Sequence, residues 1–115
     1  MASFVITKRF SGDYKFELTS RKGKTIFTSK AYELRMDCES DVEYVRSAFQ
    51  TCSFVKFKTT GGKFFFRLVI GDVVMATSRK YTTELMVQKG IDEIVKYGSE
   101  AEILDFSNND FKFED

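Results

Sequence analysis

The chain has 115 residues, of which 43% are hydrophobic and 16% aromatic, and its 18 Lys and Arg nearly balance its 17 Asp and Glu. This hydrophobic content excludes disorder over most of the length, and the balance of charge gives no bulk attraction to nucleic acid or to an anionic membrane. No apolar run reaches the roughly 18 residues of a membrane span and no signal-peptide pattern opens the sequence, so we expect a cytoplasmic protein.

Three strands are predicted before residue 30. The first covers residues 4–10, and the second carries Tyr14, Phe16 and Leu18 in alternation with polar residues, which is the pattern of a strand with one buried face. The third covers residues 25–29 and returns from a glycine-containing turn at residues 20–24. We therefore expect an antiparallel meander.

A helix is predicted over residues 35–49. Cys38, Val42, Val45 and Phe49 recur at spacings of four, three and four, which place them on one helical face. We interpret Cys38 as a small core residue, because the sequence has no CxxC pair and no histidine that could activate a thiol. An apolar strand at residues 54–57 follows the helix.

The second half of the sequence repeats the first. A shift of 50 residues aligns the early strands and turns, and the shift becomes 49 after the second hairpin, whose turn is one residue shorter. The second helix ends at Gly98, which we interpret as a helix stop, and a last strand covers residues 103–106. The matched pairs include Gly12 with Gly62, Phe16 with Phe66, Leu18 with Leu68, Thr28-Ser29 with Thr77-Ser78, Tyr32 with Tyr81, Val42 with Ile91 and Val45 with Ile94.

This repetition predicts an α+β fold of two tandem units, residues 4–53 and 54–106, in a single domain over residues 1–106. Each unit would expose an apolar sheet face and cover it with its helix. We therefore expect a single antiparallel sheet with both helices on one face. Residues 107–115 are predicted to be a polar, acidic, frayed tail.

The sequence resembles the YegP-like family in the order of an aromatic strand, a glycine-containing turn, a Thr-Ser-x-x-Tyr segment and a helix. The segment occurs as Thr28-Ser29-Lys30-Ala31-Tyr32 and as Thr77-Ser78-Arg79-Lys80-Tyr81, and the resemblance covers about residues 4–106. Members are small bacterial proteins of unknown function with single or tandem repeats. The resemblance implies two β-β-β-α-β units that form one sheet and exchange their C-terminal strands, and it implies no established activity.

The first repeat departs from the family pattern in its helix. The position usually held by glycine is Asp41, whereas Gly90 keeps it in the second repeat. Leu34 also stands where Thr83 could cap the second helix. A role that needs a close backbone approach at this glycine is therefore not expected of the first repeat.

The Thr-Ser pairs could suggest a nucleophile, but we do not predict an enzyme. A nucleophilic Ser29 or Ser78 needs a base, and without histidine only a Ser–Lys arrangement could serve. The hydroxyl groups of Thr28 and Thr77 and of the two serines are instead predicted to satisfy backbone groups where a strand ends.

Tyr32 and Tyr81 could line a pocket, but we predict that they anchor the helices to the sheet, because the position repeats where packing needs it. Carboxylates around the first helix are predicted to be solvated instead of converging on one metal ion. They are Asp37, Glu39, Asp41 and Glu43. We predict neither a metal site nor a cofactor.

Two basic features form the candidate binding surface. One is the hairpin tip Arg21-Lys22-Gly23-Lys24, with Lys15 and Lys30 on either side in the sequence. The other is a set predicted on the outward face of the sheet, where Phe65, Phe27 and Lys15 would form a mixed patch. The members of this outward set are Lys56, Lys58, Lys63, Phe65 and Arg67.

The expected function is that of a non-enzymatic binding or structural module whose partner is a protein. Single-stranded nucleic acid is the alternative, because a sheet with aromatic and basic residues can stack bases and follow phosphates. Glu17 interrupts the outward face, however, and the second hairpin tip, Gly71-Asp72, does not repeat the basic one. We expect a monomer, with dimers formed through sheet edges at high concentration.

Overall fold

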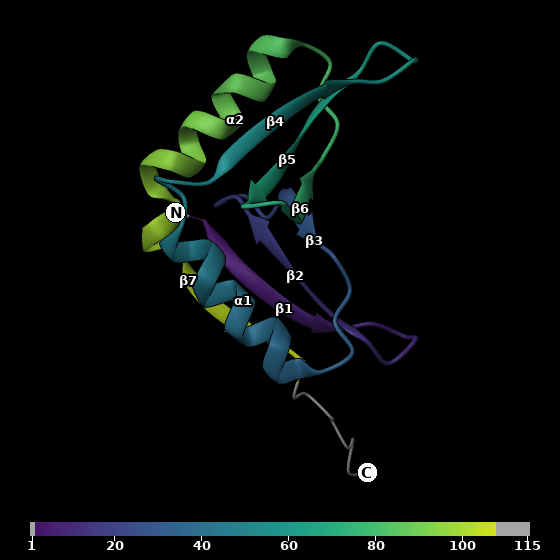
Figure 1. Cartoon of the computed structure of the whole chain (residues 1–115), viewed down its shortest axis with the longest axis vertical. Coiled ribbons are helices and arrows are strands. Elements are labelled where there is room, and N and C mark those ends of the chain that lie inside the picture. The colour runs from purple at the N-terminus through teal and green to yellow at the C-terminus, as the bar shows by residue number, and fades with distance from the viewer. Residues whose placement is uncertain (1, 108–115) are drawn as a thin grey trace.

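The structure is a computed structural model that describes residues 2–107, and in it two helices lie on one face of a seven-stranded sheet (Figure 1). The strand order is β4-β5-β6-β3-β2-β1-β7. The elements in chain order are β1 (Ser3–Lys8), β2 (Tyr14–Thr19), β3 (Thr25–Ser29), α1 (Arg35–Ser47), β4 (Ser53–Lys58), β5 (Phe64–Ile70), β6 (Val73–Ser78), α2 (Glu84–Tyr97), a 3-10 turn (Gly98–Glu100) and β7 (Glu102–Asp105).

The two halves of the sheet have the same pairing. Ile6 of β1 lies opposite Phe16 of β2, and Lys56 of β4 lies opposite Phe66 of β5, so the register is displaced by 50 residues. The halves meet where β3 pairs antiparallel with β6. The α+β architecture and the placement of both helices on one face are confirmed.

One strand pair differs from the expected antiparallel sheet. β7 pairs with β1 in parallel, with Phe4 opposite Ile103, so the sheet is mixed. The reason is that α2 ends near the start of β1, since Ala2 and Glu100 line the same hollow. β7 therefore enters the sheet beside the first residue of β1 and runs in its direction, as a strand that follows a crossover helix does.

Most of the core lies between the sheet and the helices, and eight apolar residues at matched positions of the two predicted units are buried there, whereas Tyr14 is only partly buried. The helices contribute Val42, Val45, Ile91 and Ile94, and the strands contribute Phe16, Leu18, Phe66 and Leu68. Cys38 is also fully buried, which confirms its interpretation as a core residue. Burial raises the pKa of its thiol to about 12, so the thiol stays protonated at neutral pH.

A β-bulge in each half places two consecutive residues in the core. Ile26 in β3 and Met75 in β6 are the extra residues, at which the register with the neighbouring strand shifts. As a result Ile26 and Phe27 are both buried, as are Met75 and Ala76. The prediction that Phe27 belongs to an outward patch is therefore wrong. Simple alternation placed it on the outer face, and the extra residue of the bulge turns it toward the helices.

The helix N-termini agree with the sequence-based prediction, whereas the C-terminus of α2 differs from it in the conformation of Gly98. Thr83 caps α2 by accepting a hydrogen bond from the backbone N–H of Met86 at 3.1 Å, whereas Leu34 gives α1 no side-chain cap. Gly98 follows the end of α2, but in right-handed conformation. Glycine at this position leaves room for the ring of Phe49, because a Cβ there would lie 2.6 Å from that ring.

β7 is joined to α1 by an ion pair. Nη2 of Arg35 lies 2.6 Å from Oδ2 of Asp105, and Ser107 donates to Asp105 through its hydroxyl and its backbone N–H. Ser107 is therefore buried, and its inclusion in a frayed tail was wrong. Residues 108–115, the remainder of that predicted tail, lie outside the described residues. Within residues 2–107, no helix is long and apolar enough to span a membrane.

The replacement Asp105→Asn is expected to reduce stability at neutral pH but much less at acid pH. Burial of Asp105 favours its protonated form, but hydrogen bonds from Ser107 and Arg35 outweigh this and lower its pKa. A lowered pKa stabilises the fold above the carboxyl's unfolded pKa of about 3.9, and this contribution disappears as the pH falls through the folded pKa. Urea unfolding at pH 7 and pH 3 should therefore show a larger difference between the two proteins at pH 7. A difference independent of pH would contradict the prediction.

Candidate binding surface

The outer edge of β4 has no partner strand within the part of the chain that the structure describes. β4 and β7 are the outermost strands, and no strand within residues 2–107 pairs with the outer side of β4. All residues of β4 except Phe54 are exposed, and Val55 and Phe57 are 40% and 37% exposed. An exposed edge presents backbone N–H and C=O groups to any strand that can approach it.

An aromatic–arginine patch, formed by Phe57, Phe65 and Arg67, covers the face of β4 and β5 that points away from the helices. The rings of Phe57 and Phe65 stack with their centroids 5.1 Å apart. The guanidinium of Arg67 lies 4.9 Å from the centroid of Phe57 and 5.6 Å from that of Phe65, within cation–π range. The patch places a flat apolar surface and a cation next to the unpaired edge.

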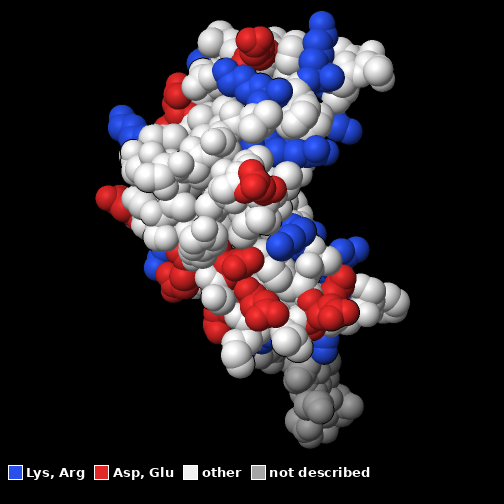
Figure 2. All heavy atoms as spheres, viewed as in Figure 1, with Lys and Arg blue, Asp and Glu red and all other residues white. Residues whose placement is uncertain are grey.

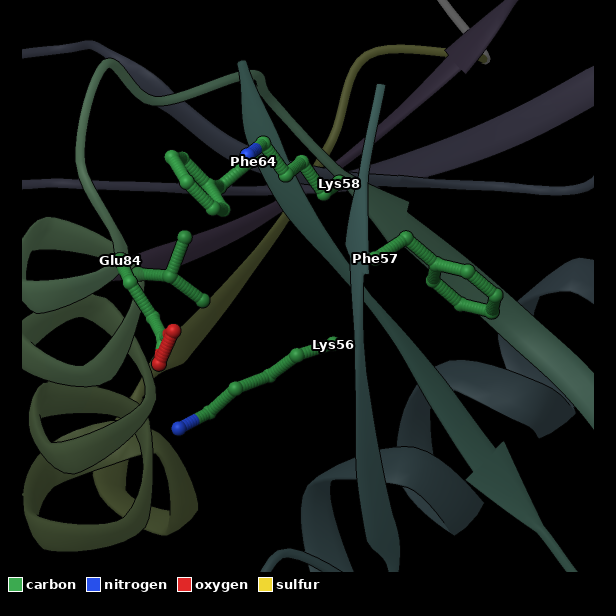
Figure 3. A pocket seen from close by; sticks show the side chains of 6 residues that line it. Lys56, Phe57, Lys58, Phe64 and Glu84 are labelled. Atoms are coloured by element: carbon green, nitrogen blue, oxygen red, sulfur yellow. The ribbon is translucent and has the colours of Figure 1, made fainter. Parts of the chain in front are cut away.

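A basic groove lies on the other face, between β4 and α2. It is a hollow of about 260 Å³ lined by Lys56, Phe57, Lys58, Phe64, Glu84 and Val87. Figure 3 shows Lys56 pointing toward α2, while Phe57 points away from it. Lys56 donates to the side-chain oxygen of Gln88, and the ammonium of Lys58 lies 5.7 Å from the ring centroid of Phe64. Neither ammonium forms an ion pair with a carboxylate of the described residues.

The structure therefore divides the predicted outward set between two faces. Phe65 and Arg67 point outward as predicted, but Lys56 and Lys58 lie on the helix side, opposite Phe66 and Phe64. The segment Phe54-Val55-Lys56-Phe57 carries apolar residues at both even and odd positions, which point to opposite faces of a strand, so its sequence does not show which face is buried. Lys63 lies in the turn between β4 and β5, where its backbone N–H donates to the hydroxyl of Thr59.

The basic hairpin tip is a separate feature. Arg21 lines a hollow with Glu93 and Glu100, and Lys24 lines another that also includes Glu93, so both lie beside α2. Lys22 is exposed in the same turn. Lys15 lies on β2 and forms an ion pair with Glu17 at 3.0 Å. The predicted surface is thus not one continuous patch.

The charge on the visible face is also divided. Figure 2 shows Asp and Glu gathered over the lower part of the molecule, where α1 begins, and Lys and Arg, with fewer Asp and Glu, over the upper part, where α2, β4 and β5 lie in Figure 1. The overall near-neutral charge therefore hides a positive region at the β4 end of the sheet.

The serines of the Thr-Ser segments satisfy backbone groups, as predicted. Ser29 accepts a hydrogen bond from the N–H of Phe16 at 2.9 Å and donates to the carbonyl of Lys30 at 2.6 Å. Ser78 makes the same pair of bonds, from Phe66 at 2.9 Å and to Arg79 at 2.7 Å. The neighbouring Thr28 donates to Glu17, and Thr77 lies opposite it in the β3–β6 pair.

The two tyrosines contact the helices in different ways. Tyr32 donates from its hydroxyl to Asp41 of α1 at 2.7 Å, which confirms the predicted anchor, and burial together with this bond raises its pKa. The hydroxyl of Tyr81 instead lies against Gly90, where a Cβ would be 2.8 Å from it. Asp41, which stands in the first unit where Gly90 stands in the second, thus contacts its tyrosine as a hydrogen-bond acceptor.

The replacement Gly90→Ala is expected to destabilise the wild-type protein by about 1 kcal/mol, because overpacking against Tyr81 costs more than the gain in helix propensity. In a Tyr81→Phe background the hydroxyl is gone, and the same replacement should stabilise the protein by about 0.5–1 kcal/mol. Urea unfolding of the four proteins measures both effects. An equal effect in the two backgrounds would contradict the proposed contact.

The turns before β2 and β5 hold the two early glycines of the repeat pattern. Gly12 and Gly62 have φ values of +99° and +83°, which side chains with a Cβ rarely adopt. Both turns therefore need glycine for a reason of backbone geometry, and these residues are structural instead of part of the binding surface.

Comparison with known proteins finds similarity to bacterial proteins of unknown function. Residues 60–105 match the model of a domain of unknown function, DUF1508. A protein from Stutzerimonas stutzeri, described as the UPF0339 protein in the ptx operon 5′ region, is 28% identical, and the alignment covers 92% of this chain and 97% of that protein.

Two solution NMR structures have the same fold. That of YegP from Escherichia coli superimposes with a TM-score of 0.81 at 24% identity, over 93% of this chain and 94% of that one. That of the UPF0339 protein SO3888 from Shewanella oneidensis has a TM-score of 0.86 at 20% identity, over 99% and 98%. The chain is therefore similar, in sequence over most of its length and in fold, to YegP-like proteins, a bacterial family of unknown function.

Proposed function

We propose that this protein is a non-enzymatic cytoplasmic module that binds another protein through the β4–β5 end of its sheet. The observation that carries the proposal is the aromatic–arginine patch of Phe57, Phe65 and Arg67 directly beside the unpaired edge of β4. Phe and Arg are enriched in protein interfaces, and Arg is among the residues that contribute most to binding energy.

The hydrogen bonds of the site residues also favour a structural reading of the Thr-Ser segments. Both serine hydroxyls accept from one backbone N–H and donate their single proton to one backbone carbonyl, so both bonds lie within the fold. The cysteines are both free thiols, in agreement with a reducing compartment.

The test is capture of partners from native cell lysate by immobilised wild-type protein and two variants. Phe57→Glu places a charge in the patch, and Phe106→Glu is the matched control, because Phe106 is a 51% exposed aromatic residue at the opposite end of the sheet. We expect a protein that is captured by wild type and by Phe106→Glu, is lost with Phe57→Glu and is unaffected by nuclease.

Capture that disappears after nuclease treatment would support the alternative, a single-stranded nucleic acid on the outward face. Stacked aromatics with an arginine could bind bases, but the basic hairpin tip that would extend such a track lies beside α2. Capture that is equal for all three proteins would contradict a role for the patch.

We also propose that the two units are tandem repeats that exchange their terminal strands within one monomer. The supporting observations are the common register at a shift of 50 residues, the pairing of β4, which follows α1, with β5, and the pairing of β7, which follows α2, with β1. Size-exclusion chromatography with light scattering should give the mass of one chain at micromolar concentration, with dimers formed through sheet edges only at much higher concentration.

A further inference from the structure

The outer side of β1 is paired with another strand, whereas the outer side of β4 has no such partner within residues 2–107. β1 pairs with β2 in the same register in which β4 pairs with β5, so each residue of β1 has a counterpart in β4. β1 has β7 on its outer side in parallel, and the N–H of Phe106 donates to the carbonyl of Ile6 at 2.9 Å. The corresponding position beside β4 has no strand within the described residues, so the carbonyl of Lys56, the counterpart of Ile6, faces an open edge.

We propose that the edge of β4 binds an extended, acidic peptide segment of a partner protein as an additional parallel strand. The proposal rests on the proposed function, because it assumes that the β4–β5 end of the sheet is the protein-binding end. It adds the mode of binding, which is strand addition to an exposed sheet edge, and the chemistry of the segment.

The parallel direction and the need for an apolar residue follow from β7. Ile103 lies opposite Phe4 and packs against the core, and the corresponding position beside β4 lies opposite Phe54, which is also half-buried at the core margin. An incoming apolar side chain there would cover Phe54. The next residue on the same face of β7 is Asp105, and its counterpart would lie opposite Lys56.

The acidic character follows from the basic groove. Two ammonium groups, those of Lys56 and Lys58, line it together with one carboxylate, that of Glu84. Opposite charges on directly facing strands stabilise a sheet, and like charges destabilise it. A carboxylate opposite Lys56 and diagonal to Lys58 would supply the ion-pair partner that both lysines lack among the described residues.

A second copy of this chain fits the same edge less well. Two copies of β4 related by a two-fold axis would pair antiparallel, and a register centred on Lys56 or on Phe57 places lysine directly opposite lysine on one face. The charge of the groove therefore favours a different, acidic strand.

The probe is a synthetic peptide with blocked ends and the sequence of residues 101–107, Ala-Glu-Ile-Leu-Asp-Phe-Ser, which the protein already binds internally beside β1. Added to isotope-labelled full-length protein, it should shift NMR signals of residues 53–58 and 84–88 and leave those of β1 unchanged. A matched peptide with Lys in place of Glu and Asp should bind at least tenfold more weakly, and added salt should weaken the acidic peptide.

Three variants locate the site. Lys56→Glu should weaken binding at least tenfold, while Lys22→Glu, a charge reversal in the turn between β2 and β3, should leave it unchanged. Lys56→Pro removes the edge N–H, which proline cannot supply, and should abolish binding. If Lys56→Pro fails to fold, as judged by loss of signal dispersion, the charge reversal still decides the proposal.

The outcomes separate this inference from the proposed function. No shifts at β4, or stronger binding of the lysine peptide, overturns the inference, whereas lysate capture that depends on Phe57 would remain. Self-association that Lys56→Glu changes identifies a second copy as the occupant and overturns it. Saturable shifts of the same residues with single-stranded DNA but not with the peptide overturn it in favour of nucleic acid.

Discussion

Replacing Phe66 by alanine is expected to lower the free energy of unfolding by about 3–5 kcal/mol, a large part of the stability of a small domain. The ring is fully buried and lies 5.6 Å, centroid to centroid, from that of Phe54. Its removal leaves a cavity between the sheet and the helices that neighbouring side chains can fill only in part. The same cost is expected for Phe16, which is equally buried and contacts the rings of Phe4 and Tyr32 at 6.0 Å.

Urea unfolding at pH 7 measures both effects. The control is Phe106→Ala, which removes an exposed ring and should change the free energy of unfolding by no more than about 0.5 kcal/mol. A loss below about 1 kcal/mol for either core variant would show that the ring does not occupy the core position described here.

The sequence predicted the strands, the helices and nearly all of the core, because one face of each element is apolar at the period of that element. Phe16 and Leu18 show the period of a strand, and Val42 and Val45 show that of a helix, and all four are buried. The bulge at Ile26 could not be predicted in this way, since one extra residue in a strand leaves no local sign in its composition. The exposure of Phe27 was mispredicted for that reason.

The candidate site was predicted only in part. Phe65 and Arg67 alternate with buried residues of β5, so their outward position follows from the sequence. The stacking of Phe57 on Phe65 needs the register between two strands, and the groove at Lys56 needs the position of α2. The unpaired edge depends on the strand order, which pairs the last strand of the chain with the first.

Truncation of the chain after Gly98 is expected to destabilise the whole protein and not only its end. The truncation removes β7, which covers the outer edge of β1 beside the fully buried Phe4 and Ile6. It also removes the carboxylate of Asp105 that pairs with Arg35 and the carbonyl of Ala101 that accepts from Arg46 at 2.9 Å. The helix of the first half thus depends on residues that follow the helix of the second half.

The matched control is truncation after Ser107, which keeps β7 and its contacts with Arg35. Thermal unfolding should show a wild-type melting temperature for this control and a decrease of roughly 10 °C or more for truncation after Gly98, the size expected for a loss of several kcal/mol in a domain of this length. Because both halves share one sheet through β3 and β6, the loss should appear as one cooperative transition at lower temperature. A protein truncated after Gly98 that stays monomeric by light scattering and melts at the wild-type temperature would contradict the proposed exchange of strands, since β1 would then be stable without the strand from the other half.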